Sequence, residues 1–189
     1  MKSALKFFAL LCLGGMSLAA APKEEVVTIF EHRKIAIAVP DGFAFAHTED
    51  SAGTITVKVT GPRDALDIQL VFMPDPENGL VTSARTRKEF MVQAFQEFVA
   101  SSVEQAMQFE ELEPHVGAGT FCVFTDATLV GKPQLPPNDF LHVTAGLKAW
   151  RGGYTVFKLF SNDTISAEYL ALLRMLRESV RELPVSPLR

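Results

Sequence analysis

Cysteine is almost absent from this chain of 189 residues: it occurs only at Cys12 and Cys122. Cys12 lies in an apolar N-terminal run that we expect to be removed, so the mature chain would keep Cys122 alone. A single cysteine excludes an intramolecular disulfide, and the fold must then rely on its hydrophobic core. Cys122 stands between Phe121 and Val123 with no cation nearby, which predicts a buried strand residue rather than a reactive thiol.

The motifs of the common enzyme classes are also missing. The sequence contains no Gly-x-Ser-x-Gly elbow, no Walker loop, no His-Glu-x-x-His and no Cys-x-x-Cys. Gly117-Ala118-Gly119 is too short for a dinucleotide fingerprint and precedes a predicted strand instead of a helix. The densest carboxylate group, at residues 110–113, lacks the ordered spacing of a calcium loop. We therefore predict no catalytic residue, no cofactor and no metal ligand.

Positive charge is scarce as well. The chain has 18 Lys and Arg against 22 Asp and Glu, and loss of Lys2 and Lys6 with the leader leaves 16 against 22, a balance of −6. No basic stripe is present, which disfavours binding to nucleic acid or to an anionic membrane surface. Of the aromatic residues, 15 are Phe, two are Tyr and one is Trp. Because Phe has no polar group, we expect this set to form the core.

The first 21 residues, MKSALKFFALLCLGGMSLAAA, have the layout of a secretory signal peptide. Two lysines precede a run without charges, and small residues follow it. We predict a signal peptide at residues 1–19, cleaved after Ala19 or alternatively after Ala20, and therefore a periplasmic or secreted bacterial protein. A retained anchor is the competing interpretation, but the run is shorter than the ~20 residues that cross a bilayer. We expect no membrane span after cleavage.

The rest of the chain predicts more strands than helices. Apolar and polar residues alternate in 54–60 and 67–73, and hairpins are predicted for 26–39 and for 140–161, the second turning at Gly152-Gly153. A strand apolar on both faces is predicted at 119–130. Apolar residues recur at helical spacing in two segments, one that follows Thr82–Thr86 and one between Thr164 and Arg181. Asn162 and Asp163 are the predicted cap of the second helix. This pattern predicts an α+β fold, an antiparallel β-sheet sandwiched by two main helices.

The order of these elements resembles the PsbP/Mog1-like family, which includes DcrB-type bacterial periplasmic proteins. The resemblance rests on an opening hairpin that runs into Val39-Pro40-Asp41-Gly42-Phe43, a closing hairpin that ends in Phe160-Ser161-Asn162-Asp163, and a terminal apolar helix. It spans residues 25–182, which we predict to be one domain. The resemblance implies a sheet sandwiched by helices and an accessory or partner-binding role, without identifying any functional residue.

Four histidines are spread along the sequence, with His32 in a predicted turn and His47 in a predicted loop beside acidic residues. His142 shares the polar face of its predicted strand with Thr144 and Lys148. We expect solvated histidines. The alternative is that distant strands bring His142 or His47 together with carboxylates into a hydrolase site or a small-ligand site.

A possible partner contact is the loop 132–139, which holds three prolines around Leu135. Prolines keep a loop extended, and a plain connection between two strands could be much shorter. Trp150 and Arg151, residue types favoured at interfaces, precede the glycine turn. We expect Leu135, Trp150 and Arg151 to form one contact edge for a periplasmic protein partner. The favoured function is an accessory or binding protein without catalytic activity.

Overall fold

The computed structural model describes residues 22–62 and 66–184, so the predicted leader and its cleavage site lie outside the described residues. Its elements, in chain order, are β1 (Lys23–Thr28), the 3-10 turn η1 (Phe30–His32), β2 (Lys34–Val39), β3 (Ala44–Glu49), β4 (Ile55–Thr60), β5 (Leu66–Asp75), α1 (Gly79–Thr82), α2 (Ala84–Ser101), β6 (Glu110–Glu111), β7 (Ala118–Thr125), β8 (His142–Trp150), β9 (Gly152–Ser161), α3 (Ala167–Glu178) and β10 (Arg181–Glu182).

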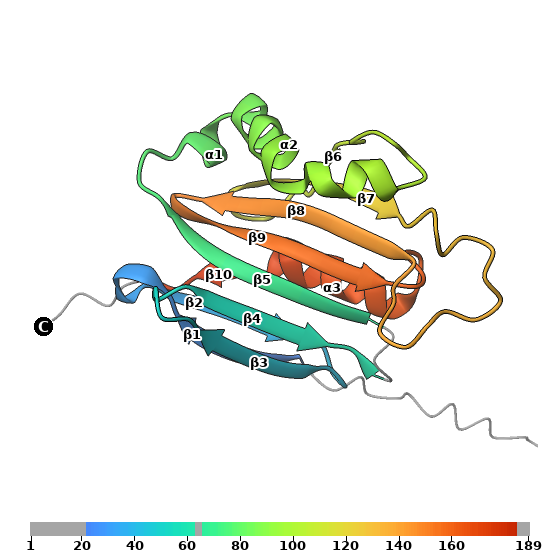
Figure 1. Ribbon diagram of the computed structural model, residues 1–189. Helices are drawn as coiled ribbons and strands as arrows, with labels where there is room; N and C mark the ends of the chain where they lie inside the picture. The colour runs from blue at the N-terminus through green and yellow to red at the C-terminus, as the bar shows by residue number, and fades with distance from the viewer. Residues whose placement is uncertain (1–21, 63–65, 185–189) are drawn as a thin grey trace, which may run out of the picture.

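The predicted α+β class is confirmed. In the described residues the strands form two antiparallel sheets, one of seven strands in the order β3-β4-β5-β9-β8-β7-β6 and one of three in the order β1-β2-β10 (Figure 1). The opening hairpin thus has the predicted partners, but it joins β10 in a sheet of its own. Consecutive strands paired by short turns account for most of the large sheet, as hairpin signals in the sequence indicated.

The large sheet is covered on both faces, by different elements. One face, here called the upper face, packs Ala145, Leu147 and Cys122 against Met91 and Phe95 of α2. The other, the lower face, packs Phe157 and Leu159 together with β4 and β5 against α3 and the three-stranded sheet. Figure 1 shows α2 and α3 on opposite sides of the sheet. These two cores confirm that Phe serves mainly in the interior.

Arg33 ties the small sheet to the tip of the β8–β9 hairpin. Its guanidinium pairs with the Glu182 carboxylate of β10 and donates hydrogen bonds to the backbone oxygens of Gly152 and Arg151, at 2.8 Å and 2.7 Å. Bidentate pairs of this kind fix geometry as well as adding stability. The turn residue Arg33 therefore holds three segments that are far apart in the sequence.

Serine side chains cap both long helices. The Ser83 hydroxyl accepts a hydrogen bond from the Thr86 N–H. The cap predicted for α3 at Asn162-Asp163 is wrong: Ser166 caps a helix that begins at Ala167. The Asp163 carboxylate instead accepts from the N–H of Ile165, which closes a turn before the helix. Among the described residues, no helix is long and apolar enough to cross a membrane.

Strand β3 was not predicted, and His47 lies in it rather than in a loop. Its side chains on the upper face are the small residues Ala44, Ala46 and Thr48, and all three are exposed. An edge strand that buries little has no need of the apolar alternation that identifies strands in a sequence. The strand predicted at 119–130 ends earlier, at Thr125, but is buried on both faces as expected.

Candidate functional site

The structure separates the residues predicted to form one contact edge. Trp150 ends β8 and is only 5% exposed, with its ring 6.3 Å from that of Phe72. Arg151 is exposed in the turn that follows. Half-buried Leu135 lies in the loop before β8, at the other end of a strand that spans about 27 Å. The three residues therefore cannot share one edge, because β8 holds them apart.

The two histidines of the enzyme alternative do not meet either. His47 is on β3 and His142 on β8, with β4, β5 and β9 between them, which is about 19 Å across the sheet. His115 and His47 are exposed, and His32 lies in η1. Within residues 22–62 and 66–184, no group of three His, Cys, Asp or Glu side chains could hold a metal ion.

His142 nonetheless belongs to a short polar chain at the start of β8. The Thr125 hydroxyl donates to the Glu104 carboxylate at 2.7 Å and lies 3.1 Å from His142 Nδ1. Because the single hydroxyl proton goes to Glu104, Nδ1–H of His142 donates to the hydroxyl oxygen. Burial lowers the pKa of His142, while Glu104 and Asp163 oppose that shift.

Glu104 mainly anchors the segment that follows α2. Partial burial acts to raise the pKa of its carboxyl, but the hydrogen bonds from the Thr125 N–H and hydroxyl hold the pKa below its usual range. The carboxylate thus fastens residues after α2 to the end of β7. We interpret the chain from Glu104 to His142 as a structural tie.

The most open polar surface lies on the upper face, beside the area that α2 covers. Helix α2 packs on β7 and β8, so no helix among the described residues lies above the upper-face side chains of β4 and β5. These side chains include Thr56, Lys58, Thr60, Asp67 and Gln69. Lys58 lies opposite Gln69, and Thr60 lies opposite Asp67, across the β4–β5 pair. We call this area the open half of the upper face. The polar face predicted for residues 54–60 is therefore confirmed.

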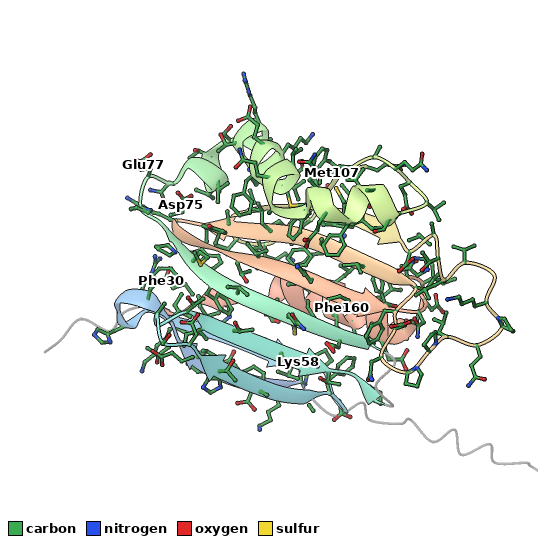
Figure 2. All side chains as sticks on the ribbon, in the orientation of Figure 1. Phe30, Lys58, Asp75, Glu77, Met107 and Phe160 are labelled. Carbon is green, nitrogen blue, oxygen red and sulfur yellow. The ribbon has the colours of Figure 1, made fainter. Side chains whose placement is uncertain are left out.

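At one end of the open half, the segment between β7 and β8 rises into a wall and forms a cleft of about 530 Å³. Figure 2 labels Lys58 and Phe160, which lie at this end of the sheet, near the long loop. The complete lining is Lys58, Thr60, Asp67, Gln69, Val143 and Phe160 from the strands, and Asp126, Thr128, Leu129, Lys132, Asn138, Asp139 and Phe140 from the wall. Both ends of the proline-rich loop thus contribute to the cleft.

Charges of both signs converge in this cleft. On the floor, Lys58 Nζ pairs with Asp67 Oδ2 at 2.8 Å, whereas Asp67 Oδ1 is buried and has no hydrogen-bond partner among the described residues. On the wall, the Lys132 ammonium and the Asp139 carboxylate are exposed, and within the described part of the chain neither has a hydrogen-bond or ion-pair partner. The cleft can therefore offer an ammonium donor and carboxylate acceptors to a bound molecule.

A second cavity, of about 450 Å³, lies where β8 meets the end of α3, and Lys148 and Trp150 line it. Lys148 is buried under α3, where its Nζ donates to the backbone oxygens of Leu176 at 2.7 Å and Val180 at 2.6 Å. Burial lowers the pKa of Lys148 to about 8. Cations stabilise the C-terminus of a helix, so this lysine acts as a cap that holds α3 to the sheet.

Cys122 is fully buried and unpaired, as predicted. Burial, with a smaller contribution from Glu110, raises the pKa of its thiol to about 12. The thiol stays protonated at neutral pH, and only the thiolate is a strong nucleophile. This position has no catalytic chemistry to offer.

The sequence did not reveal the cleft, although part of its signal was present. The alternation in 54–60 and 67–73, with a turn between them, fixes Lys58 opposite Gln69 and Thr60 opposite Asp67. Hairpin register could therefore have placed these four polar side chains together. Lys132 and Asp139 carry no comparable signal, because only the tertiary course of the loop brings them over the strands.

Comparison with known proteins does not identify a family. No family model, curated protein or solved structure matches this chain. The resemblance to the PsbP/Mog1-like family stays a prediction.

Proposed function

We propose that this chain is an exported accessory or binding protein, which holds a partner in the cleft on the open half of the upper face and catalyses no reaction. The observation that carries the proposal is the pair of unpartnered opposite charges, Lys132 and Asp139, above a floor that contains Lys58 and Asp67. The signal peptide predicted at residues 1–19 supports a periplasmic or secreted location.

The lining of the cleft favours a protein partner. Sites for small molecules are mostly apolar and enclosed, with a few polar groups that fix orientation. This cleft is lined mainly by polar and charged side chains and continues onto the open half of the sheet. Such a surface suits a partner segment that carries both an acidic and a basic side chain. Polar and charged side chains of this kind are typical of the rims of protein interfaces.

A charge-neutral pair of variants tests the proposal. The purified mature protein is used to capture its partner from a periplasmic extract, in parallel with Lys132→Ala/Asp139→Ala. The control, Arg85→Ala/Glu89→Ala, also removes one charge of each sign, from an exposed pair on α2. We expect the cleft variant to lose the partner while the control retains it. Equal capture by all three proteins would contradict binding at the cleft.

The alternative function, a hydrolase built around His142, has the short chain to Thr125 and Glu104 in its favour. His142 does not line the cleft, however, and a general base must reach the substrate. We expect no turnover of nitrophenyl esters by the purified protein. Turnover that His142→Gln abolishes would favour the enzyme.

A further inference from the structure

Strand β3 is the one sheet edge in the described residues that has no protection against pairing with another strand. Edges are normally guarded by shortness, charge, lysine or proline. At the other edges, β6 and β10 have two residues each, all charged, and β1 begins with Lys23, Glu24 and Glu25. In contrast, β3 has six residues and a single charge, Glu49, at its end.

The backbone of β3 presents unused hydrogen-bonding groups at this edge. Asp50 N–H donates to the Thr54 oxygen at 3.1 Å, which makes these two residues a hydrogen-bonded pair of the β3–β4 ladder. Such pairs alternate along an antiparallel ladder, so Thr48, Ala46 and Ala44 also bond to β4. The N–H and C=O groups of the intervening residues therefore point away from β4; these residues are Phe45, His47 and Glu49.

A bond on the other side of β4 gives the same assignment. Gly61 N–H donates to the Leu66 oxygen at 2.8 Å, and Gly61 is opposite Leu66 in the β4–β5 register. Odd-numbered residues of β4 thus bond to β5, which leaves the even-numbered residues for β3. The direction of the outer backbone groups of β3 follows from two independent hydrogen bonds.

We propose that two copies of this chain associate by antiparallel pairing of β3 with β3. The two-fold axis is perpendicular to the sheet and passes between the two Ala46 residues. This register places Phe45 opposite His47 of the second copy, so that both residues use their outward backbone groups. It also places Ala44 opposite Thr48 on the upper face, where small side chains leave room for a flat approach.

A second copy fits this edge because the register brings no like charges together. Glu49 lies beyond the paired residues, and the cross-strand pairs are formed by alanine, threonine, phenylalanine and histidine. The contact is small, however, since only the five residues 44–48 of each chain pair. We therefore expect a reversible dimer whose formation depends on protein concentration. The two clefts would open on the same side of the joined sheet.

The decisive variant removes one outward N–H and leaves the fold intact. Proline is tolerated at edge positions whose N–H faces solvent, so His47→Pro should fold but not pair. His47→Ala is the matched control, because it removes the same side chain and keeps the N–H. By sedimentation equilibrium at concentrations up to about 1 mM, we expect mass to rise toward two chains for the wild type and His47→Ala, and to stay at one for His47→Pro.

A charge-swap experiment provides a test if His47→Pro does not fold. Ala46 is exposed and lies at the axis, so Ala46→Lys would place two lysines opposite each other, and Ala46→Glu two glutamates. We expect each variant alone to be monomeric and their equimolar mixture to recover the dimer. The proposal would be overturned by a monomeric wild type or by a dimer that survives His47→Pro or Ala46→Lys. An equimolar mixture of the two Ala46 variants that stays monomeric would also overturn it. A monomeric wild type would direct attention to a strand from another protein as the occupant.

Discussion

The buried lysine of β8 gives a quantitative prediction about stability and pH. Lys148 is 2% exposed, and burial lowers its pKa from 10.5 to about 8. The perturbation is Lys148→Met, which keeps the length and the apolar stem of the side chain and removes its charge. The variant cannot titrate at this position, so the difference between the two proteins isolates the lysine.

The direction in which stability changes with pH follows from whether the folded or the unfolded state binds the proton more tightly. Between pH 8 and pH 10.5 the unfolded chain keeps the Lys148 proton and the folded chain releases it, so the free energy of unfolding rises with pH. A shift of this size corresponds to about 3 kcal/mol in full, of which about 1 kcal/mol appears between pH 7 and pH 9. Below pH 8 both states are charged, and the cost of burying the cation is complete.

The assay is urea unfolding of both proteins at pH 7, 8 and 9. Cys122, whose pKa is raised to about 12, has the opposite effect at high pH, but it is common to both proteins and cancels in the difference. We expect the free energy of unfolding of the wild type to rise by about 1 kcal/mol relative to that of the variant between pH 7 and pH 9. A difference that stays constant would refute the reasoning and show that the carbonyl contacts of Leu176 and Val180 outweigh burial.

Three further predictions concern the core, the helix caps and metals. Cys122→Asp should destabilise the fold by several kcal/mol in urea unfolding, because it buries an unpaired charge. The native Cys122 thiol should resist thiol reagents, and fast labelling would argue against its burial. Ser83→Ala and Ser166→Ala should each cost about 1 kcal/mol of stability through loss of a helix cap, and no change in the urea midpoint would count against the caps. A chelator should leave the melting temperature unchanged; a drop that one added cation reverses would reveal a metal site.

The parts of the fold that bury apolar side chains were accessible from the sequence. The alternation in β4 and β5, the double-sided apolar run of β7 and the stripes of α2 and α3 all reflect burial, and each element is found where the pattern placed it, within a few residues. The start of α3 was misplaced because four polar residues, at positions 162, 163, 164 and 166, compete for the cap. Local patterns do not decide between Asp163 and Ser166.

The missing parts depend on contacts that no local pattern records. Strand β3 buries too little to show alternation, and the separation of Leu135 from Trp150 follows from the length of β8 rather than from either residue. The cleft depends on the course of the loop 132–139. Its prolines indicate that the loop is extended but do not determine its direction. Lys132 and Asp139 look like ordinary surface charges until the strands beneath them are known.

Binding of a partner at the cleft is tested most directly by photocrosslinking in intact cells. A photoreactive phenylalanine analogue would replace Thr128, which lines the cleft from the exposed wall, and in a control protein it would replace exposed Glu89 on α2. We predict one discrete crosslinked protein from position 128, which disappears when Lys132→Ala/Asp139→Ala is added, and none from position 89. No adduct at position 128, or an identical pattern from both positions, would contradict the proposal that this cleft holds a partner.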